Sequence, residues 1–261
     1  MITVVSDKRL VFICGLHRSG TSIVSRILRD HPDISGFSGT GVPQDEGQFL
    51  QTVFPTARQF GGPGKFGFDP SSFLDENSPL STPENARKLF HEWSRYWDLN
   101  ASLLLEKSPP NIVRSRFFQA MFPRSHFIVI LRHPLAVSLA TAKWSKTPIE
   151  SLVEHWLICY NRFFADMEYL KSCRIVRYEE FVLDPERELD RIYSFLQVCH
   201  SDSAHEVYAD VNEKYFSRWS VFSREQANLE SVERLIGRYE DKVNKYGYSL
   251  VDLHKLLALK V

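Results

Sequence analysis

The chain has 261 residues, of which 43% are hydrophobic and 25% charged, and its 32 Lys and Arg side chains are balanced by 32 Asp and Glu side chains. This composition is that of a globular protein and excludes a disordered chain, a collagen-like repeat and a coiled coil. A net charge of zero argues against a protein that wraps nucleic acid, so an anionic ligand must be held by a local cluster. We expect residues 1–261 to form one α/β domain.

No apolar stretch approaches the roughly 20 residues that a membrane-spanning helix requires. The N-terminal stretch places basic residues beside an apolar run, but no small-residue cleavage site follows. We therefore expect no secretory signal and a cytoplasmic protein. The four cysteines have no CxxC spacing and are expected to be buried thiols, not metal ligands or disulfide partners. They are Cys14, Cys159, Cys173 and Cys199.

The spacing of apolar residues predicts strands that alternate with helices along the chain. A buried strand is predicted at 9–14, and the helix after it carries Ile23, Val24, Ile27 and Leu28. Further strands are predicted at 103–105, 126–131 and 174–177. A helix is predicted from Pro83, with an apolar stripe that reaches Trp97, and another after Pro110. Two more are predicted at 134–144 and, following a capping box, at 147–170. The last two begin at Asp184 and at about Glu225, and the second of these ends at a C-cap near Gly247.

Between about residues 32 and 80 the composition shifts, because eight of the twelve glycines lie from Gly36 to Gly67. This pattern predicts a long, Gly-rich loop insertion, and loops of that length are often functional. Its phenylalanines are expected to form a small core of their own. Strands separated by helices imply a P-loop-like, three-layer α/β fold with a central parallel sheet, whose ligands bind beyond the carboxyl ends of the strands.

The first predicted strand leads into a glycine-rich turn with the GxxxxG frame of a phosphate-binding loop, Gly15-Leu16-His17-Arg18-Ser19-Gly20-Thr21-Ser22. Such a turn converges backbone N–H groups on an anion, and the N-terminus of the following helix adds positive potential. ATP- and GTP-hydrolysing loops have lysine where this chain has Thr21, and no later predicted strand ends in an aspartate for Mg²⁺. The sequence therefore predicts a phosphate site charged by Arg18 and disfavours a kinase.

This loop resembles the 5′-phosphosulfate loop of sulfotransferases that use 3′-phosphoadenosine 5′-phosphosulfate (PAPS). The strand at 126–131 followed by Arg132-His133-Pro134 resembles the 3′-phosphate segment of the same family, whose arginine grips the ribose 3′-phosphate. The family usually has a serine eight residues after this arginine; that position is Ala140 here, with Ser138 and Thr141 nearby. The resemblance implies cofactor contacts from His17, Arg18, Ser19, Gly20, Thr21, Ser22, Arg132 and Ser138.

Three further stretches resemble segments of that family, the first of them a segment of its bacterial and tyrosylprotein branches. The segment LEKSPP resembles a Lys-x-Pro element whose lysine touches the transferring sulfuryl group, which implies a catalytic role for Lys107. Tyr178 of RYEE matches a tyrosine that stands beside the adenine, and Arg218 lies in a segment that implies another cofactor contact. The resemblance, which spans about 9–220, implies a sulfotransferase that releases adenosine 3′,5′-bisphosphate and sulfates a hydroxyl of a small molecule, glycan or peptide.

In-line transfer of a sulfuryl group to a hydroxyl needs a base for the hydroxyl proton and cations near the leaving phosphate, and it needs no metal in principle. The insertion offers two adjacent carboxylates, and in related branches a glutamate from this region is the base. We choose Glu46, because Asp45 is also a suitable N-cap for a helix at 47–54. Asp45 remains the first alternative to it, and His17, His31 and His133 are further alternative bases.

Two other functions remain open on the sequence. The first is a P-loop nucleotide or small-molecule kinase. The threonine at position 21 argues against it, because such enzymes have a lysine at this position. The second is a non-catalytic nucleotide-binding module, which would need neither Lys107 nor the acidic pair. The sequence specifies neither the acceptor nor the oligomeric state.

Overall fold

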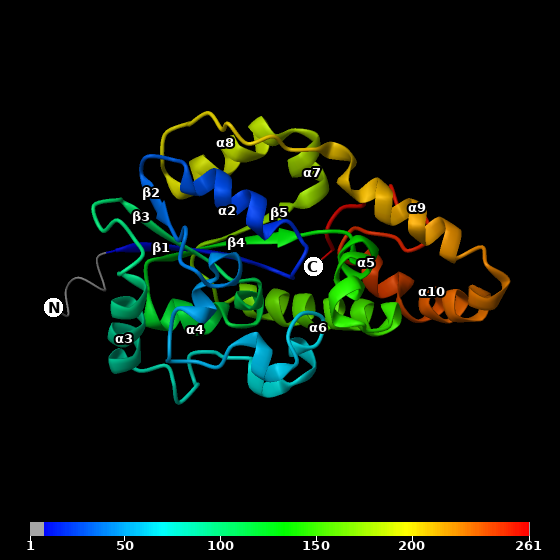
Figure 1. The fold of residues 1–261 in the computed structure, drawn as a ribbon, viewed down its shortest axis with the longest axis horizontal. Helices are drawn as coiled ribbons and strands as arrows, with labels where there is room; N and C mark the ends of the chain where they lie inside the picture. Colours follow the sequence, from blue (N-terminus) through cyan, green and yellow to red (C-terminus); the bar gives the residue numbers. More distant parts are fainter. Residues whose placement is uncertain (1–7, 261) are drawn as a thin grey trace.

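A computed structural model describes residues 8–260 of the chain. Five strands form one sheet in the order β2-β3-β1-β4-β5, and every neighbouring pair is parallel (Figure 1). The strands are β1 (Arg9–Gly15), β2 (Ile34–Gly36), β3 (Leu103–Lys107), β4 (Ser125–Leu131) and β5 (Cys173–Arg177). A parallel sheet between layers of helices confirms the predicted fold class.

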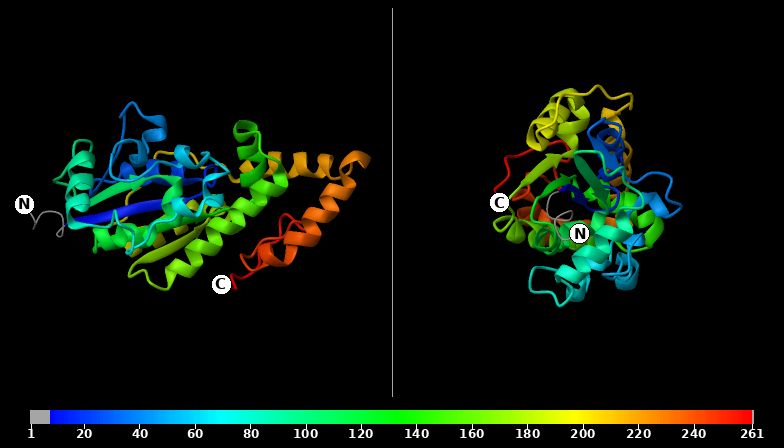
Figure 2. Two further views of the ribbon diagram at one scale, coloured as in Figure 1. Left: turned by 90° about the horizontal axis from the view of Figure 1, so that it is seen from below. Right: turned by 90° about the vertical axis from the view of Figure 1, so that its left-hand side faces the viewer.

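Helices cover both faces of the sheet and extend beyond one end of it. Those of one face are α2 (Thr21–Arg29), α7 (Tyr178–Leu183) and α8 (Pro185–Leu196), and those of the other are α3 (Pro83–Trp93), α4 (Ser115–Met121) and α6 (Ile149–Met167). Beyond the carboxyl ends of the strands lie α5 (Pro134–Ser145), α9 (Glu213–Phe222) and α10 (Leu229–Asn244), the last two projecting away from the sheet (Figure 2).

Alternating side chains of the strands feed two apolar clusters. On β1, Leu10, Phe12 and Cys14 belong to the cluster that contains α3, α4 and α6, whereas Val11 and Ile13 belong to the cluster under α2, α7 and α8. Each of these five side chains has no exposed surface. Because both faces are covered, the strands are continuous apolar runs, which is the signal that made them predictable.

Most predicted elements are present, with three corrections. β2 was not predicted, because three residues that include Ser35 and Gly36 give no apolar run. The expected capping box before α6 is absent, since Pro148 precedes that helix and no side chain caps it. Trp97 lies beyond the end of α3 and is nevertheless buried, with its indole N–H bonded to the carbonyl of Leu105.

The insertion folds as short 3₁₀ turns, which are η1 (Pro43–Asp45), η2 (Gly47–Phe49), η3 (Ala57–Phe60), η4 (Phe66–Phe68) and η5 (Pro70–Ser72). The expectation that it has a core of its own is wrong, because Phe54 and Phe66 are buried in the main cluster. The physical reason is close approach to α6: a Cβ on Gly67 would lie 2.5 Å from Cys159 Sγ. Glycine lets the insertion pack directly on that helix.

The cysteines are all free thiols. Cys14 and Cys159 are buried and Cys173 is half-buried, but Cys199 is exposed, so the expectation of a buried thiol is wrong there. None of the helices between residues 8 and 260 combines the length and apolarity needed to cross a bilayer. The stretch on which the expectation of no secretory signal rests includes residues 1–7, which lie outside the described residues.

Candidate active site

The residues singled out in the sequence come from strands whose carboxyl ends meet at one edge of the sheet. In the parallel register Ile13 of β1 lies beside Lys107 of β3, and Gly15 lies beside Ile130 of β4. Arg132 follows β4 directly, and Tyr178 follows β5. The topology therefore brings the glycine-rich loop, Lys107, Arg132 and Tyr178 to the same edge, where ligands of such folds bind.

The loop after β1 has the backbone geometry of an anion cradle. Gly20, with φ of 107°, lies directly before α2, and a Cβ there would lie 2.4 Å from the ring of Tyr178. No side chain caps α2, so its first N–H groups are available to an anion. Within the described residues, the buried Ser19 Oγ and His17 Nδ1 have no hydrogen-bond partner. Unpartnered polar atoms beside such a cradle fit a polar ligand such as a phosphate.

Arg132 is a buried cation held only by neutral oxygens. Its Nε and Nη2 donate to Asn212 Oδ1 at 2.9 and 2.6 Å, and its Nη1 donates to the carbonyl of Arg18 at 2.9 Å. Asn212 is oriented in turn by Glu179, whose Oε1 accepts from Asn212 Nδ2 at 2.8 Å. Between residues 8 and 260 no carboxylate lies within ion-pair distance of the guanidinium, and burial lowers the pKa of Arg132. A bound phosphate would supply the missing negative charge, so the site fits the group.

The other predicted cofactor residues differ in burial and in whether they contact Arg132. The ring of Tyr178 lies 4.0 Å from the Arg132 guanidinium carbon and closes over Gly20. Arg18 is exposed, and its guanidinium lies over the ring of Trp144, at 4.7 Å. Ser138 is fully buried on α5, and its hydroxyl has no partner among the described residues. Thr21 is buried and Ser22 is half-buried at the start of α2.

Arg218 is not brought to this cluster by any contact. It is exposed on α9, and no hydrogen bond or ion pair within the part of the chain that the structure describes joins it to the loop or to Arg132. The same segment contributes Asn212 and Tyr215 instead, the latter with its ring 5.7 Å from the guanidinium. Both stand in the stretch that carried the resemblance, but their roles depend on the distant Arg132 and could not be assigned from the sequence.

Lys107 and Glu46 form a buried pair at the edge of the sheet. Lys107 Nζ lies 3.4 Å from Glu46 Oε1 and donates to the carbonyl of Gln44 at 2.9 Å. The second carboxylate oxygen of Glu46 accepts from Gln48 Nε2 at 2.6 Å. Burial raises the pKa of Glu46, and the Lys107 charge opposes part of that rise. A carboxylate with a raised pKa is a stronger proton acceptor than an exposed one.

Three of the alternative bases, Asp45, His31 and His133, form hydrogen bonds with other groups, and the fourth, His17, has a lowered pKa. Asp45 accepts from both the backbone N–H and the hydroxyl of Thr40, and it does not cap the helix expected after it, since η2 has no side-chain cap. His31 and His133 each accept a backbone N–H at Nδ1, so Nε2 carries the proton and donates to a carbonyl. His17 stands in the loop, and burial together with Lys107 lowers its pKa to about 3, which makes it a weak base.

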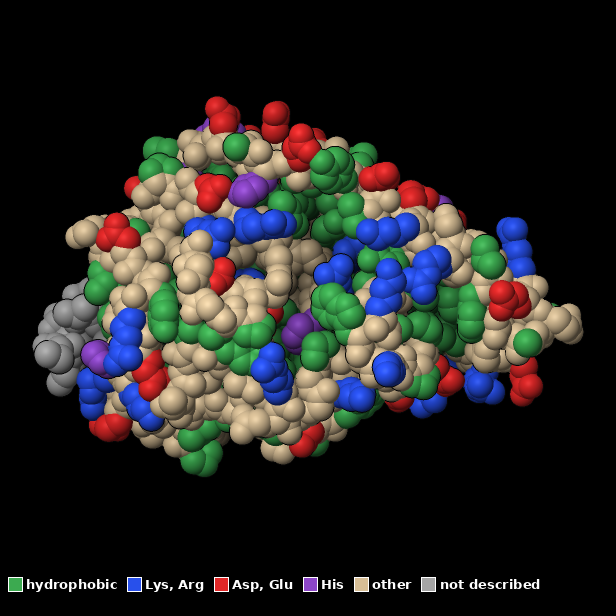
Figure 3. All heavy atoms as spheres, viewed as in Figure 1, with side chains coloured by type: hydrophobic (Ala, Val, Ile, Leu, Met, Phe, Trp, Pro, Cys, Tyr) green, Lys and Arg blue, Asp and Glu red, His purple; other side chains and the backbone are tan. Residues whose placement is uncertain are grey.

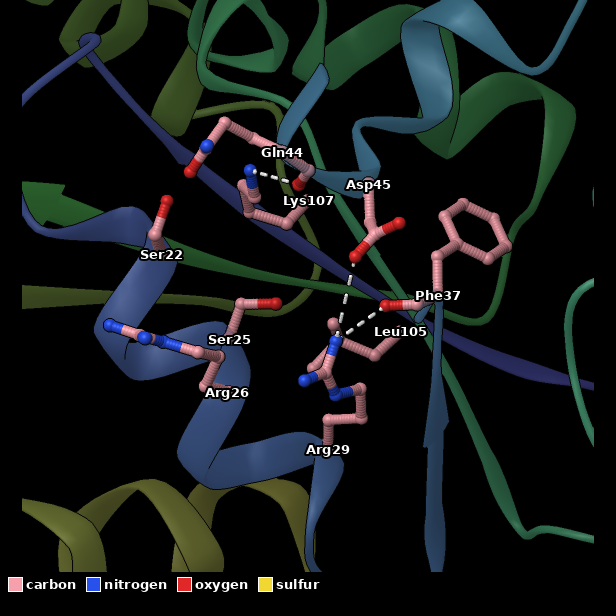
Figure 4. Close-up of a pocket in the computed structure, with 9 residues that line it drawn as sticks. All are labelled: Ser22, Ser25, Arg26, Arg29, Phe37, Gln44, Asp45, Leu105 and Lys107. Carbon is pink, nitrogen blue, oxygen red and sulfur yellow. Dashed lines mark hydrogen bonds and ion pairs between the residues drawn. The ribbon is translucent and has the colours of Figure 1, made fainter. Parts of the chain in front are cut away.

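A pocket of about 230 Å³ leads to Lys107 between α2 and the η1 turn (Figure 4). Ser22, Ser25 and Arg26 line its α2 side, and Arg29 crosses toward Asp45 and the carbonyl of Phe37. The face seen in Figure 3 is hollowed near its middle, with lysine and arginine side chains around the hollow. Within residues 8–260, no group of three or more His, Cys, Asp or Glu side chains is arranged to hold a metal ion.

Known proteins resemble this chain in sequence over most of its length. A model of the sulfotransferase family matches residues 11–202. A putative protein-tyrosine sulfotransferase of Caenorhabditis briggsae is 25% identical over 228 residues, which cover 82% of this chain and 76% of that protein. Protein-tyrosine sulfotransferase 2 of Gallus gallus is 23% identical over 205 residues, 74% of this chain, and the match spans about half (52%) of that relative.

Solved structures of sulfotransferases share the fold of this chain. The sulfotransferase domain of the olefin synthase of Synechococcus PCC 7002 superposes with a TM-score of 0.53 at 19% identity, covering 81% of this chain and 88% of that one. Sulfotransferase STF9 from Mycobacterium avium gives 0.53 at 14% identity, covering 92% and 78%. With a family model matched over most of the chain, and a glycine-rich loop with the geometry of an anion cradle at the expected edge of the sheet, this chain belongs to the sulfotransferase family and is a transferase.

Proposed function

We propose that the chain transfers the sulfuryl group of PAPS to a hydroxyl acceptor, with Glu46 as the base. The observation that carries this proposal is the buried Lys107–Glu46 pair, 3.4 Å apart, at the sheet edge that also holds the phosphate-binding loop and Arg132. A module that only binds nucleotides has no need of a buried carboxylate beside a lysine, because burying such a pair is costly unless it serves a purpose.

The donor would be held by its two ends. The N–H groups at the start of α2, with Arg18, Ser19 and the Thr21 hydroxyl, suit the 5′ side. Arg132 suits the 3′-phosphate, because a guanidinium without an acidic partner can form charge-assisted hydrogen bonds to it. The ring of Tyr178 lies beside both Arg132 and the glycine-rich loop. When bound, PAPS supplies a sulfuryl group already activated by a phosphate leaving group.

The residues on the acceptor side complete the chemistry. The oxygen of the acceptor hydroxyl forms a bond to sulfur while the bond between sulfur and the bridging phosphate oxygen breaks. Glu46 takes the proton that this hydroxyl loses. The products are a sulfate ester, adenosine 3′,5′-bisphosphate and the proton held by Glu46. Lys107 opposes the negative charge that grows on the bridging oxygen, which lowers the barrier by electrostatic stabilisation.

The pocket between α2 and η1, which Lys107 lines and which the adjoining Glu46 does not, suits the approach of the acceptor to this pair. Two relatives are named for protein tyrosine, so a phenolic peptide belongs in the panel of acceptors beside sugars and small alcohols. A kinase remains disfavoured, because Thr21 stands where the phosphate-binding lysine of NTPases is found and Arg132 follows β4 in place of an Mg²⁺ ligand. We expect no metal requirement.

Calorimetry and a transfer assay test the proposal together. Adenosine 3′,5′-bisphosphate should bind more tightly than ATP with Mg²⁺, and labelled sulfate should pass from PAPS to at least one class of acceptor in excess chelator. Tighter binding of ATP with Mg²⁺ would revive the kinase. Tight bisphosphate binding without transfer to any acceptor would favour the non-catalytic binding module.

A further inference from the structure

A third ionisable side chain adjoins the Lys107–Glu46 pair and takes no part in the reaction proposed above. Glu106 is the last residue but one of β3, a strand that is otherwise apolar until Lys107, and its side chain is 1% exposed. Consecutive strand residues point to opposite faces of the sheet. Leu105 and Lys107 line the pocket beside α2, and Glu106 faces the insertion on the other side.

Glu106 accepts a hydrogen bond from the backbone of Gly47, the residue that follows Glu46 in the sequence. Its Oε1 accepts the backbone N–H of Gly47 at 2.9 Å and the hydroxyl of Ser108 at 2.5 Å, and its Oε2 accepts from Asn111 Nδ2. The carbonyl of Gly47 accepts from the indole N–H of Trp93 at 3.0 Å. Both polar groups of Gly47 are therefore fixed by buried side chains from outside the insertion.

The contact between Glu106 and Gly47 leaves no room for a side chain. A Cβ on Gly47 would lie 2.5 Å from Glu106 Oε1 and 2.6 Å from its Cγ. The backbone of Gly47 therefore rests directly on the carboxyl group, with no intervening side chain to absorb a shift. Shortening residue 106 would remove the acceptor of the peptide N–H that directly follows Glu46.

The carboxylate of Glu46 depends on the position of this peptide. It lies between Gln48 Nε2, at 2.6 Å, and Lys107 Nζ, at 3.4 Å, and the N–H of Gln48 itself donates to Ser108 Oγ at 3.0 Å. Resting on the proposed function, in which Glu46 is the base, we propose that Glu106 is a positioning residue. Its hydrogen bond to the Gly47 N–H holds Glu46 against Lys107.

The hydrogen bond, not the charge, does the positioning. Burial raises the pKa of Glu106 to about 7, and a carboxyl oxygen accepts a backbone N–H in either protonation state. Glutamine keeps the length of the side chain and a carbonyl acceptor, whereas alanine removes both. The two substitutions at position 106 are therefore expected to behave differently, which a general loss of stability would not produce.

The test compares Glu106→Ala and Glu106→Gln, each alone and in a Glu46→Gln background. The readouts are hydrogen exchange at the Gly47 amide, affinity for adenosine 3′,5′-bisphosphate, and the single-turnover transfer rate to the best acceptor of the hydroxyl panel. Glu188→Gln is the matched control, because Glu188 is a glutamate 2% exposed on α8, paired with Arg191 and outside the site. Gly47→Ala displaces the same peptide without removing a buried acid and replaces Glu106→Ala if that variant does not fold.

We expect Glu106→Ala to expose the Gly47 amide to exchange and to slow transfer about 10- to 100-fold, the usual cost of removing a group that orients a reactive one. Glu106→Gln should restore the rate to within about fivefold, with bisphosphate affinity unchanged. In the Glu46→Gln background, Glu106→Ala should slow transfer no further, because the two residues act through one group.

The outcomes separate this inference from the function on which it rests. An unchanged Gly47 exchange rate in Glu106→Ala, or an equal slowing by Glu106→Ala with and without Glu46, would overturn the positioning role alone. A wild-type rate in Glu46→Gln would overturn the choice of base and this inference with it. Failure of the wild-type chain to bind bisphosphate would overturn the proposed function before any variant is compared.

Discussion

Replacing Arg132 by methionine tests the assignment of the 3′-phosphate. Methionine fills much of the space of the arginine stem without its charge, so a large cavity is avoided. Burial lowers the pKa of Arg132, which shows that the environment disfavours its charge, and no carboxylate within the described residues pairs with it. Because the substitution also leaves Asn212 Oδ1 and the Arg18 carbonyl without their donor, the variant without ligand should lose about 1 to 3 kcal/mol of stability at most, which differential scanning calorimetry would measure.

The expected loss of affinity follows from the contacts that Arg132 can make. Its Nη1 and Nη2 now donate to neutral oxygens, of Arg18 and Asn212, and can be redirected to a phosphate as charge-assisted hydrogen bonds. Losing such a contact in a shielded site costs about 2 kcal/mol, or about 30-fold in Kd. Adenosine 5′-phosphate, which lacks the 3′-phosphate, should bind the variant and the wild type with similar affinity.

Isothermal titration of both nucleotides against both proteins isolates the contribution of the 3′-phosphate to the binding affinity. The ratio of the two Kd values should be about 30-fold in the wild type and collapse toward one in Arg132→Met. An equal weakening of both nucleotides would mean that Arg132 shapes the site without touching the 3′-phosphate. Unchanged bisphosphate binding would refute the assignment.

Four further results are expected. Glu46→Gln should keep bisphosphate affinity near wild type and slow single-turnover transfer about 10²- to 10⁴-fold, whereas Asp45→Asn should be nearly normal; the reverse result would make Asp45 the base. Lys107→Ala should slow transfer and also weaken bisphosphate binding measured by calorimetry, since its charge faces the donor in the ground state too; a loss of binding with normal transfer at saturation would contradict its catalytic role. Transfer in excess chelator should match that in Mg²⁺, and a strict Mg²⁺ dependence of the rate would contradict the mechanism. The pKa of Glu106 rises from 4.5 to about 7 on folding, so its contribution to stability, up to about 3 kcal/mol, is fully present below about pH 4.5 and is lost as pH rises to about 7. Urea titrations should show a steeper loss of stability over this pH range in the wild type than in Glu106→Gln, and equal slopes would contradict the raised pKa.

The sequence determined those features that depend on contiguous residues. The buried strands of a sheet covered on both faces are unbroken apolar runs, so four of the five were predictable, and β2 escaped because it is three residues long. The glycine-rich turn after β1 was predictable because its backbone geometry needs glycine at fixed places, as Gly20 against the ring of Tyr178 illustrates. The carboxyl-end location of Lys107 and Arg132 followed from the strands that precede them.

The tertiary structure alone decided which of the polar candidates meet. Glu46 is separated from Lys107 by 61 positions and Arg132 from Asn212 by 80, and no local pattern records such pairings. On the sequence His31 and His133 remained alternatives to the carboxylates as the base, whereas in the structure both ring nitrogens of each are bound to backbone groups. Hydrogen bonds form only between groups that the fold brings within about 3 Å, and here the parallel sheet does so by gathering strand ends and the insertion at one edge.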